Sequence, residues 1–507
     1  MVNRYLATKK VKSTLSLKKT SALLSKVQII ILAGSIIQIP MLFLNLSEAD
    51  SFRFAQTTLV VKQFMSFGFD PRMPLPIFGA NSFLPFEFPI FQGVAALLGS
   101  VFNTSPLFAA RLAAIIFFQI SALFIYLISK KLFIRRVAVI TLILFEFSPF
   151  GLRYAHSPLI EFAAVSLMLI AIYLFILYFD EQLLRLKAIY FMGALSALVL
   201  GYLAKVTTGV ALTPLLLLPL FSIRSEKFSS KEVFNKIFPI GISLSISLLI
   251  VAFWTRYSDQ VKEMNPITSH LVSTLPHMKA WTVGNLKDRF DVVAWETILL
   301  KYLGPISGGF LILLLLGFFA YNSQRKLLIS LLFFTIIFPM VIFINLYKNH
   351  QYYVSAIFSI LVLLCALGIN GIVIYFEPVK SKVFVTVFIL LLLFSSATSR
   401  YGLNYFADIL HHSQPPALVS EIKSVVPENS YIMYLGCDWN LEIPFYIESK
   451  ILIVPEWGIR PNQSDLNQVQ YVAFCSLFPQ DQDLSLDKYF PEIDTANKLS
   501  PNVIMIR

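Results

Sequence analysis

Long uncharged runs of apolar residues, separated by short polar turns, dominate the chain. An α-helix of roughly twenty apolar residues crosses a bilayer core of about 30 Å. The pattern predicts about eleven membrane-spanning helices, at Val27–Leu46, Leu107–Ile128, Val137–Phe150, Glu161–Phe179, Ala188–Leu203, Val206–Phe221, Ile237–Trp254, Ile298–Ala320, Leu327–Leu346, Tyr352–Phe376 and Val383–Ser396.

Beyond residue 400 the pattern changes to short apolar segments bounded by polar residues. These predict a helix near 416–425 and buried strands at Tyr431–Leu435, Ile451–Val454 and Tyr471–Phe474. The chain therefore divides into a basic tail (1–26), a transmembrane domain (27–397) with a large first outer loop (47–106), and a small α/β domain (398–507). The predicted class is a polytopic α-helical membrane protein with an external C-terminal domain.

Composition supports this class, because 57% of the residues are hydrophobic, only 14% are charged, and the mean hydropathy is +0.72. A soluble protein this apolar would expose large patches and aggregate.

The net charge of +12 is unevenly distributed. From residue 400 onward the chain has seven Lys and Arg against thirteen Asp and Glu, so the positive excess lies elsewhere. Much of it lies in alternate turns between the predicted spans: Lys130, Lys131, Arg135, Arg136, Arg185, Lys187, Arg224, Lys227, Lys231, Lys236, Arg325, Lys326, Lys380 and Lys382.

Basic residues favour cytoplasmic loops. We therefore expect a cytoplasmic N-terminus, an external or periplasmic C-terminal domain and a location in the plasma (inner) membrane. Basic residues dispersed in this way do not form a nucleic-acid patch, so no nucleic acid is expected as a partner.

The predicted topology places a set of charged and aromatic residues on the external face: Glu48, Asp50, Glu87, Arg153, His156, Glu161, Lys205, Arg256, His350, Tyr352 and Tyr353. Carboxylates and cations at one membrane face are what a reaction on a lipid phosphate requires. The cations neutralise the phosphate, and a carboxylate takes a proton from the acceptor.

Simpler explanations exist for most of these residues. Lys205 could extend its amine to the membrane interface, and Arg153 and His156 could be ordinary loop residues. His350 could belong to an aromatic belt with the two tyrosines that follow it.

The two acidic residues after the first span differ in strength as candidates. Asp50 is the stronger, because an acid directly after a span and before an apolar stretch is costly without a role. Glu48 fits a solvated loop acid equally well. Acid pairs can hold a divalent cation, but further ligands are not identifiable. No metal site and no certain cofactor are therefore predicted, and a divalent cation stays an alternative.

Two of the three cysteines, Cys437 and Cys475, lie at the ends of predicted strands in the external domain. On an oxidising face they could form a disulfide; two buried thiols are the alternative. Cys365 lies in a span, where packing accounts for it.

Several short motifs resemble one known family. They are Glu48-Ala49-Asp50-Ser51, Glu87-Phe88-Pro89-Ile90-Phe91-Gln92, Ala204-Lys205-Val206-Thr207, His350-Gln351-Tyr352-Tyr353, and the stretch from Cys437 to Tyr446. Their order resembles that of the GT-C membrane glycosyltransferases, particularly the bacterial group related to the lipid A aminoarabinose transferase and the protein O-mannosyltransferases. The chain departs from the usual pattern at Ser51, Glu161 and Val206.

The resemblance implies a glycosyltransferase that moves a sugar from a polyprenyl-phosphate donor to a lipid, glycan or protein acceptor, with inversion. Asp50 would act as the base, with Glu48 beside it as a second catalytic candidate. Lys205, with Arg153 or His350, would stabilise the phosphate, and Glu87 and Glu161 would position the substrate.

The rival hypothesis is a transporter or flippase of lipid-linked sugars, for which internal symmetry would be expected. We find no internal repeat in the sequence, which favours the enzyme. A catalytically inactive scaffold is a third reading.

Overall fold

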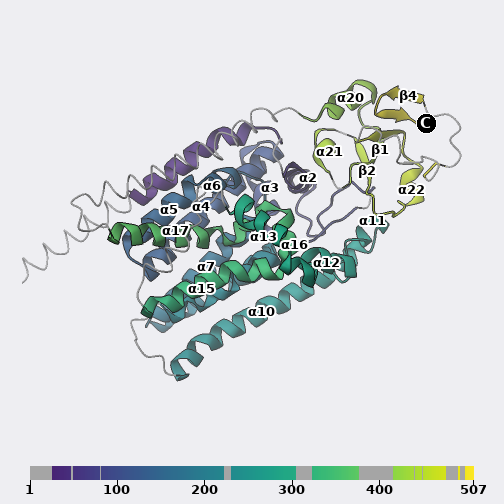
Figure 1. The fold of residues 1–507 in the computed structure, drawn as a ribbon. Helices are drawn as coiled ribbons and strands as arrows, with labels where there is room; N and C mark the ends of the chain where they lie inside the picture. Colours follow the sequence, from purple (N-terminus) through teal and green to yellow (C-terminus); the bar gives the residue numbers. More distant parts are fainter. Residues whose placement is uncertain are drawn as a thin grey trace, which may run out of the picture.

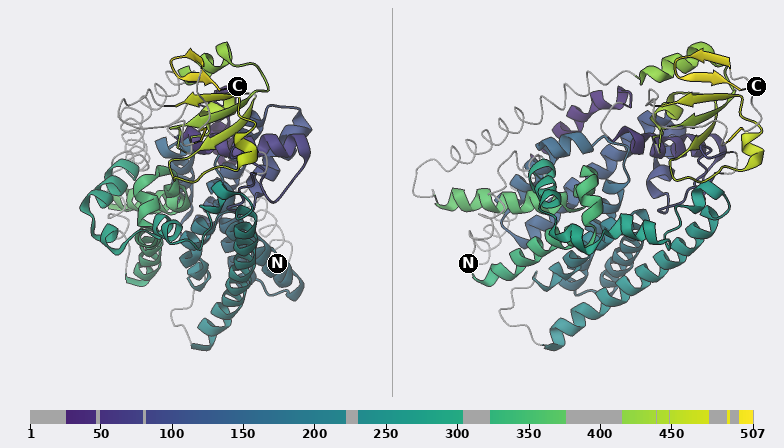
Figure 2. Two further views of the ribbon diagram at one scale, coloured as in Figure 1. Left: turned by 90° about the vertical axis from the view of Figure 1, so that its right-hand side faces the viewer. Right: turned by 45° about the vertical axis from the view of Figure 1, so that its right-hand side comes forward.

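The computed structural model describes residues 26–46, 50–79, 82–221, 230–303, 323–375, 415–438, 440–447, 449–475, 489–490 and 497–506. Within them a helical bundle carries a small mixed sheet at one end (Figures 1 and 2). Glu48, residues 1–25, the predicted eleventh span and most of the predicted eighth lie outside the described residues.

Seven described helices are long and apolar enough to cross a membrane: Lys26–Phe43, Pro106–Leu132, Glu161–Asp180, Leu184–Ala204, Val233–Lys262, Arg325–Ile342 and Gln351–Ile374. The predicted third and sixth spans are shorter, as α5 (Arg135–Phe147) and as α9 (Val206–Leu212) followed by η2 (Thr213–Leu220). The predicted multi-pass helical class is confirmed, and the number of eleven spans stays a prediction.

With the labels of Figure 1, these spans and the remaining elements of the bundle are η1 (Ile39–Phe43), α2 (Ser51–Phe67), α3 (Ile90–Phe102), α4 (Pro106–Leu132), α6 (Pro149–Tyr154), α7 (Glu161–Asp180), α8 (Leu184–Ala204), α10 (Ser230–Lys262), α11 (Pro266–Ser269), α12 (Pro276–Val283), η3 (Leu286–Phe290), α13 (Val292–Glu296), the π-helical turn η4 (Thr297–Tyr302), α15 (Ser323–Ile342), α16 (Ile344–Asn349), η6 (Gln351–Val354) and α17 (Ser355–Tyr375).

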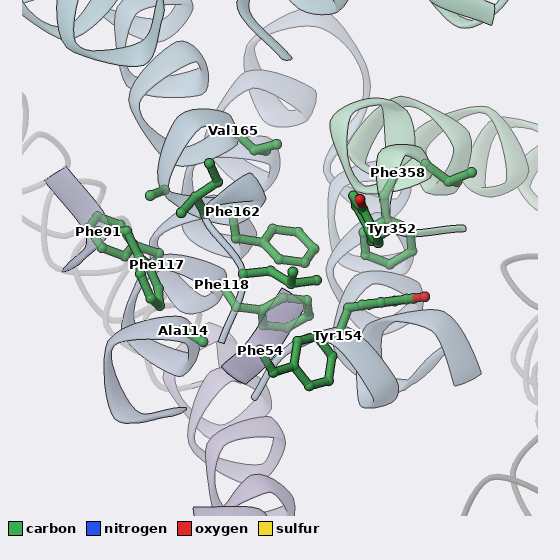
Figure 3. Close-up of a cluster of buried hydrophobic side chains, with 14 of the residues drawn as sticks. Phe54, Phe91, Ala114, Phe117, Phe118, Tyr154, Phe162, Val165, Tyr352 and Phe358 are labelled. Atoms are coloured by element: carbon green, nitrogen blue, oxygen red, sulfur yellow. The ribbon is translucent and has the colours of Figure 1, made fainter. Parts of the chain in front are cut away.

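Aromatic side chains from several helices pack together in the interior of the bundle (Figure 3). The rings of Phe118 of α4 and Phe162 of α7 meet edge-on with their centres 4.9 Å apart, and the ring of Phe150 of α6 lies 4.9 Å from that of Phe358 of α17. Phe150 in turn lies 4.6 Å from Tyr154, measured between ring centroids. Offset and edge-on aromatic pairs add roughly 0.5–1.5 kcal/mol each beyond the burial of their area. This cluster therefore fixes α6, and with it Tyr154, against α4, α7 and α17.

The C-terminal domain contains a five-stranded sheet in the order β2-β1-β3-β5-β4. Its elements are α20 (Ala417–Val425), β1 (Tyr431–Leu435), α21 (Glu442–Tyr446), β2 (Lys450–Val454), α22 (Gln463–Leu466), β3 (Tyr471–Phe474), β4 (Asn497–Ser500) and β5 (Val503–Met505). β1 pairs in parallel with β2 and β3, whereas β5 pairs antiparallel with β3 and β4. The predicted helix and three strands are confirmed, and β4 and β5 are additional.

Part of the predicted first outer loop is built into this sheet. The backbone carbonyl of Ile77 accepts a hydrogen bond of 2.7 Å from the backbone amide of Ile453, and Phe78 forms an antiparallel bridge with Leu452. The loop therefore covers the β2 edge, which would otherwise present unpaired backbone groups. Gly79 follows with φ of +97°, a conformation that side chains with a Cβ rarely adopt.

Cys437 and Cys475 form a disulfide, which resolves the two alternatives left by the sequence. They follow β1 and β3, neighbouring parallel strands in which Leu435 lies opposite Phe474. Cysteines just beyond that register are adjacent across the sheet, with Cα atoms 4.9 Å apart.

Digestion without reducing agent should yield the Cys437 and Cys475 peptides linked, and reduction should separate them. The closed loop spans a sequence separation of 38 residues, so replacing both cysteines by serine should destabilise the domain by about 4 kcal/mol. Thermal unfolding with and without reductant measures this. Recovery of both thiols alkylated under native conditions would contradict the bridge.

Candidate active site

Asp50 lies at the start of α2, as its N-cap residue, and only 9% of it is exposed. Its Oδ2 accepts a hydrogen bond of 3.1 Å from the hydroxyl of Tyr154 and lies 3.9 Å from Nη2 of Arg153. Gln351 joins the group, because its Oε1 accepts a hydrogen bond of 3.2 Å from Nη1 of Arg153. A carboxylate held by a hydroxyl and a guanidinium has a fixed direction and a stabilised charge.

The helix α6 sets Arg153 and Tyr154 beside Asp50. Ser148 caps α6 by accepting a hydrogen bond of 3.2 Å from the backbone amide of Gly151, as expected of a serine at this position. The buried aromatic cluster then holds the Tyr154 ring in place (Figure 3).

The C-terminal domain also contacts the segment that carries Asp50. The Ser51 hydroxyl donates a hydrogen bond of 2.7 Å to Oε2 of Glu442, at the start of α21. The Tyr446 hydroxyl, at the other end of α21, donates one of 2.8 Å to the carbonyl of Leu46. The two ends of the helix α21 therefore bind the chain on both sides of residues 47–50. We call these two contacts the α21 bracket.

Lys205 and Glu161 form a buried ion pair, with 2% of each side chain exposed. Glu161 begins α7, and Lys205 occupies the extended residue (φ −164°, ψ 107°) between α8 and α9. The last carbonyls of a helix have no hydrogen-bond partner within that helix. Near the end of α8, the carbonyl of Leu203 instead accepts a hydrogen bond of 2.9 Å from the backbone amide of Phe88. This contact brings the loop with Glu87 next to Lys205.

Two tyrosines cover the ammonium of Lys205. Its Nζ lies 4.5 Å from the ring centre of Tyr353 and 5.3 Å from that of Tyr352, which is the geometry of cation–π contacts. His350 stacks on Tyr352 with ring centres 5.1 Å apart. Burial lowers the pKa of His350 to about 4, and the charges of Arg53 and Lys205 act in the same direction, so the ring is neutral at pH 7.

A small polar pocket lies beside this pair. Its lining is Arg53, Gln56, Thr57, Val60, Met73, Glu87, Gln92, Leu159, Ile160 and Glu161. Oε2 of Glu161 has no hydrogen-bond partner among the residues that the structure describes.

The structure thus gathers most of the predicted site residues at the domain end of the bundle: Asp50, Arg153, Glu87, Glu161, Lys205, His350, Tyr352 and Tyr353. Two other predicted site residues, His156 and Arg256, do not join this group. His156 is fully buried and its Nδ1 lies 2.8 Å from Oε1 of Gln38 in the first span. Arg256 is exposed on α10.

The sequence did not indicate Arg53, Tyr154, Gln351 or Glu442 as part of the site. For Arg53 the spacing was an available signal. In a helix, residues three apart are neighbours, so Arg53 would lie beside Asp50 at the start of α2. The others reach the site only through contacts between distant segments, 104 residues apart for Tyr154 and 391 for Glu442.

No group of three or more His, Cys, Asp or Glu close enough to hold a metal ion occurs among the described residues. Glu48, which would be the natural second acid beside Asp50, is outside them.

Comparison with known proteins finds one matching family and several solved structures with a similar fold. Residues 87–257 match the family described as dolichyl-phosphate-mannose-protein mannosyltransferase. That stretch contains Glu87, Arg153, Glu161 and Lys205. No curated protein sequence matches the chain significantly.

Two solved structures share the fold over most of the chain. ArnT from Cupriavidus metallidurans, solved bound to undecaprenyl phosphate, is 14% identical with a TM-score of 0.64, and the match covers 95% of this chain and 98% of that one. The oligosaccharyltransferase AglB from Archaeoglobus fulgidus, solved with an inhibitory peptide and a dolichol-phosphate, is 11% identical with a TM-score of 0.53, covering 88% and 69%.

The chain is therefore a polytopic membrane protein that shares its fold with ArnT and with AglB. More particularly, its fold matches ArnT over nearly the full length of both chains.

Replacing Lys205 by Met should destabilise the protein by about 3–5 kcal/mol, because Glu161 would be left buried without its partner. The double variant Lys205→Met/Glu161→Gln should recover at least half of that loss. Thermal unfolding of the purified proteins in detergent compares them. A single variant as stable as the wild type would show that the pair does not hold this end of the bundle.

Proposed function

We propose that the protein is an integral-membrane glycosyltransferase that takes its sugar from a polyprenyl-phosphate donor. The observation that supports this most is the juxtaposition, at one end of the bundle, of Asp50 with the Lys205–Glu161 pair and the polar pocket. A transferase of this type needs a base for the acceptor, cations for the leaving phosphate and polar groups for the sugar.

The reaction would be a single displacement with inversion. The acceptor hydroxyl or amine loses its proton to Asp50 as it bonds to the anomeric carbon of the sugar. The bond from that carbon to the phosphate oxygen breaks, and the electron pair leaves with the polyprenyl phosphate. In this scheme Tyr154 and Arg153 orient Asp50, and the cationic side of the site, with Lys205 near Tyr352 and Tyr353, stabilises the departing phosphate.

The two neighbours with lipid phosphates support this donor class. ArnT was solved with undecaprenyl phosphate and AglB with a dolichol-phosphate. The acceptor could be a lipid, a glycan or a protein. His156 and Arg256 stay candidates for holding parts of the substrates farther from the reacting centre.

Replacing Asp50 by Asn keeps the size of the side chain and its hydrogen bond from Tyr154 but removes its basicity. Turnover should fall by roughly two to four orders of magnitude, with little change in the stability of the protein. The measurement is the release of polyprenyl phosphate from a labelled lipid-linked sugar by purified protein in detergent, where no gradient exists to drive a transporter.

Ser464 of the external domain, which is exposed, serves as a matched control: Ser464→Ala should leave turnover unchanged. Full turnover by Asp50→Asn would remove Asp50 from its role and leave Glu48 or Glu161 as the base. No release by the wild type with any donor would contradict the enzyme itself.

We also propose that the site faces outward from the plasma (inner) membrane, with the N-terminus in the cytoplasm. A cysteine at Ser464 should then react with an impermeant maleimide on intact cells. A cysteine at Gln182, exposed in the turn between α7 and α8, should react only after permeabilisation. The native background is low, because Cys437 and Cys475 are bridged and Cys365 is buried. The reverse labelling would place the site on the cytoplasmic side.

A further inference from the structure

We propose that the outer end of α10 positions Glu87 in the site, and that Trp254 and Ser258 are the side chains that do so. This role of α10 rests on the proposed function and adds positioning residues to the same site.

The helix α10 is attached to the bundle more loosely than the other described spans. It lies along one edge of the bundle (Figures 1 and 2), and only 22% of its most apolar window is buried, against 83% for the span Gln351–Ile374. Much of it exposes apolar side chains such as Phe238, Leu249 and Phe253, as expected of a span in contact with lipid. Polar contacts near its outer end therefore need a separate explanation.

Trp254 and Ser258 share one face of α10, because residues four apart lie one above the other on a helix. This face meets the loop that carries Glu87. Nε1 of Trp254 donates a hydrogen bond of 3.2 Å to the carbonyl of Phe86, and the hydroxyl of Ser258 donates one to the carbonyl of Pro85. The helix therefore holds both residues that precede Glu87.

The residue that follows Glu87 is held from two sides. The ring of Phe88 meets that of Trp254 edge-on, with the centres 5.0 Å apart. Its backbone amide donates a hydrogen bond of 2.9 Å to the carbonyl of Leu203, at the end of α8. The backbone on both sides of Glu87 is thus fixed, and this sets where its side chain can point.

Further contacts fasten the outer end of α10 to the same loop. Nζ of Lys262 lies 2.7 Å from Oδ1 of Asp259 and 5.2 Å from the ring centre of Phe86. Asn265, just after α10, donates a hydrogen bond of 3.0 Å from its Nδ2 to the carbonyl of Phe78. The loop and the end of the helix therefore form one unit.

Glu87 is the charged group that this unit places. Its side chain borders the pocket together with those of Arg53 and Glu161, and its charge acts on Arg53 and Lys205. The interaction between charges depends on their separation, and it is strong where water is largely excluded. The position of Glu87 therefore sets how much positive charge the two cations offer to a departing phosphate.

Replacing Trp254 by Phe keeps an aromatic ring against Phe88 and removes the indole N–H. Release of polyprenyl phosphate from a labelled lipid-linked sugar measures kcat/KM for the full-length protein in detergent. This value should fall by roughly three- to tenfold, the effect of one lost hydrogen bond. Ser258→Ala should cause a similar loss, whereas Ser258→Thr keeps the hydroxyl and should retain most of the activity. The matched control is Ser247→Ala, which removes a hydroxyl that bonds the carbonyl of Ser243 within α10 itself and should leave kcat/KM unchanged.

A double-mutant cycle separates positioning from a purely structural role. If Trp254 acts through the carboxylate of Glu87, Trp254→Phe should change kcat/KM by less than about twofold in the Glu87→Gln background. A role confined to folding would lower kcat/KM by the same factor in both backgrounds, and thermal unfolding in detergent would show the loss of stability. Equal factors in the two backgrounds, or full activity of both Trp254→Phe and Ser258→Ala, would overturn the proposed role of α10.

The wild type distinguishes this failure from that of the proposed function. If it cleaves a lipid-linked donor and the cycle gives equal factors, the positioning role is excluded and the proposed function stands. If it cleaves no donor, the proposed function fails, and the positioning role fails with it.

Discussion

The buried ion pair between Lys205 and Glu161 is the interaction on which the site depends. An apolar bundle tolerates a charge only when it has a partner, and each of these two side chains is almost fully enclosed. The lysine stands at a break between α8 and α9, where the backbone leaves helical geometry. That break frees the carbonyl that holds Phe88, so one electrostatic requirement fixes α7, α8 and the loop with Glu87 together.

The helix α2 fixes the position of Asp50 relative to the pocket. Asp50 caps it, and the face from Arg53 to Val60 lines the pocket. Because a helix is stiff, the proposed base and the side chains that line the pocket cannot shift independently. The aromatic cluster in the bundle interior holds Tyr154 in the same way, and Tyr154 in turn orients Asp50.

Much of the fold follows from local patterns in the sequence. Runs of apolar residues located the spans, and short β-rich segments located β1, β2 and β3, because both signals depend on neighbouring residues. Asp50 could be singled out by its place after a span. By contrast, Tyr154, Gln351 and Glu442 meet the Asp50 segment only after distant chain segments pack. The helical character of α2 was missed because its polar residues are spread around the helix rather than gathered on one face, and because the helix is too short to resemble a span. The pairing of Cys437 with Cys475 depended on the register of two strands, which composition does not reveal.

The α21 bracket has a consequence for biosynthesis. It joins Ser51 to Glu442 and Leu46 to Tyr446, across sequence separations of 391 and 400 residues. At roughly 5–20 residues per second, the ribosome needs about 20–80 seconds to make the chain between the two halves of this contact. The segment with Asp50 is made first, and throughout that time it lacks the contacts with Glu442 and Tyr446. A nascent or truncated chain therefore has Tyr154 and Arg153 to hold Asp50 but lacks both contacts of the α21 bracket, which form only after Tyr446 has been made.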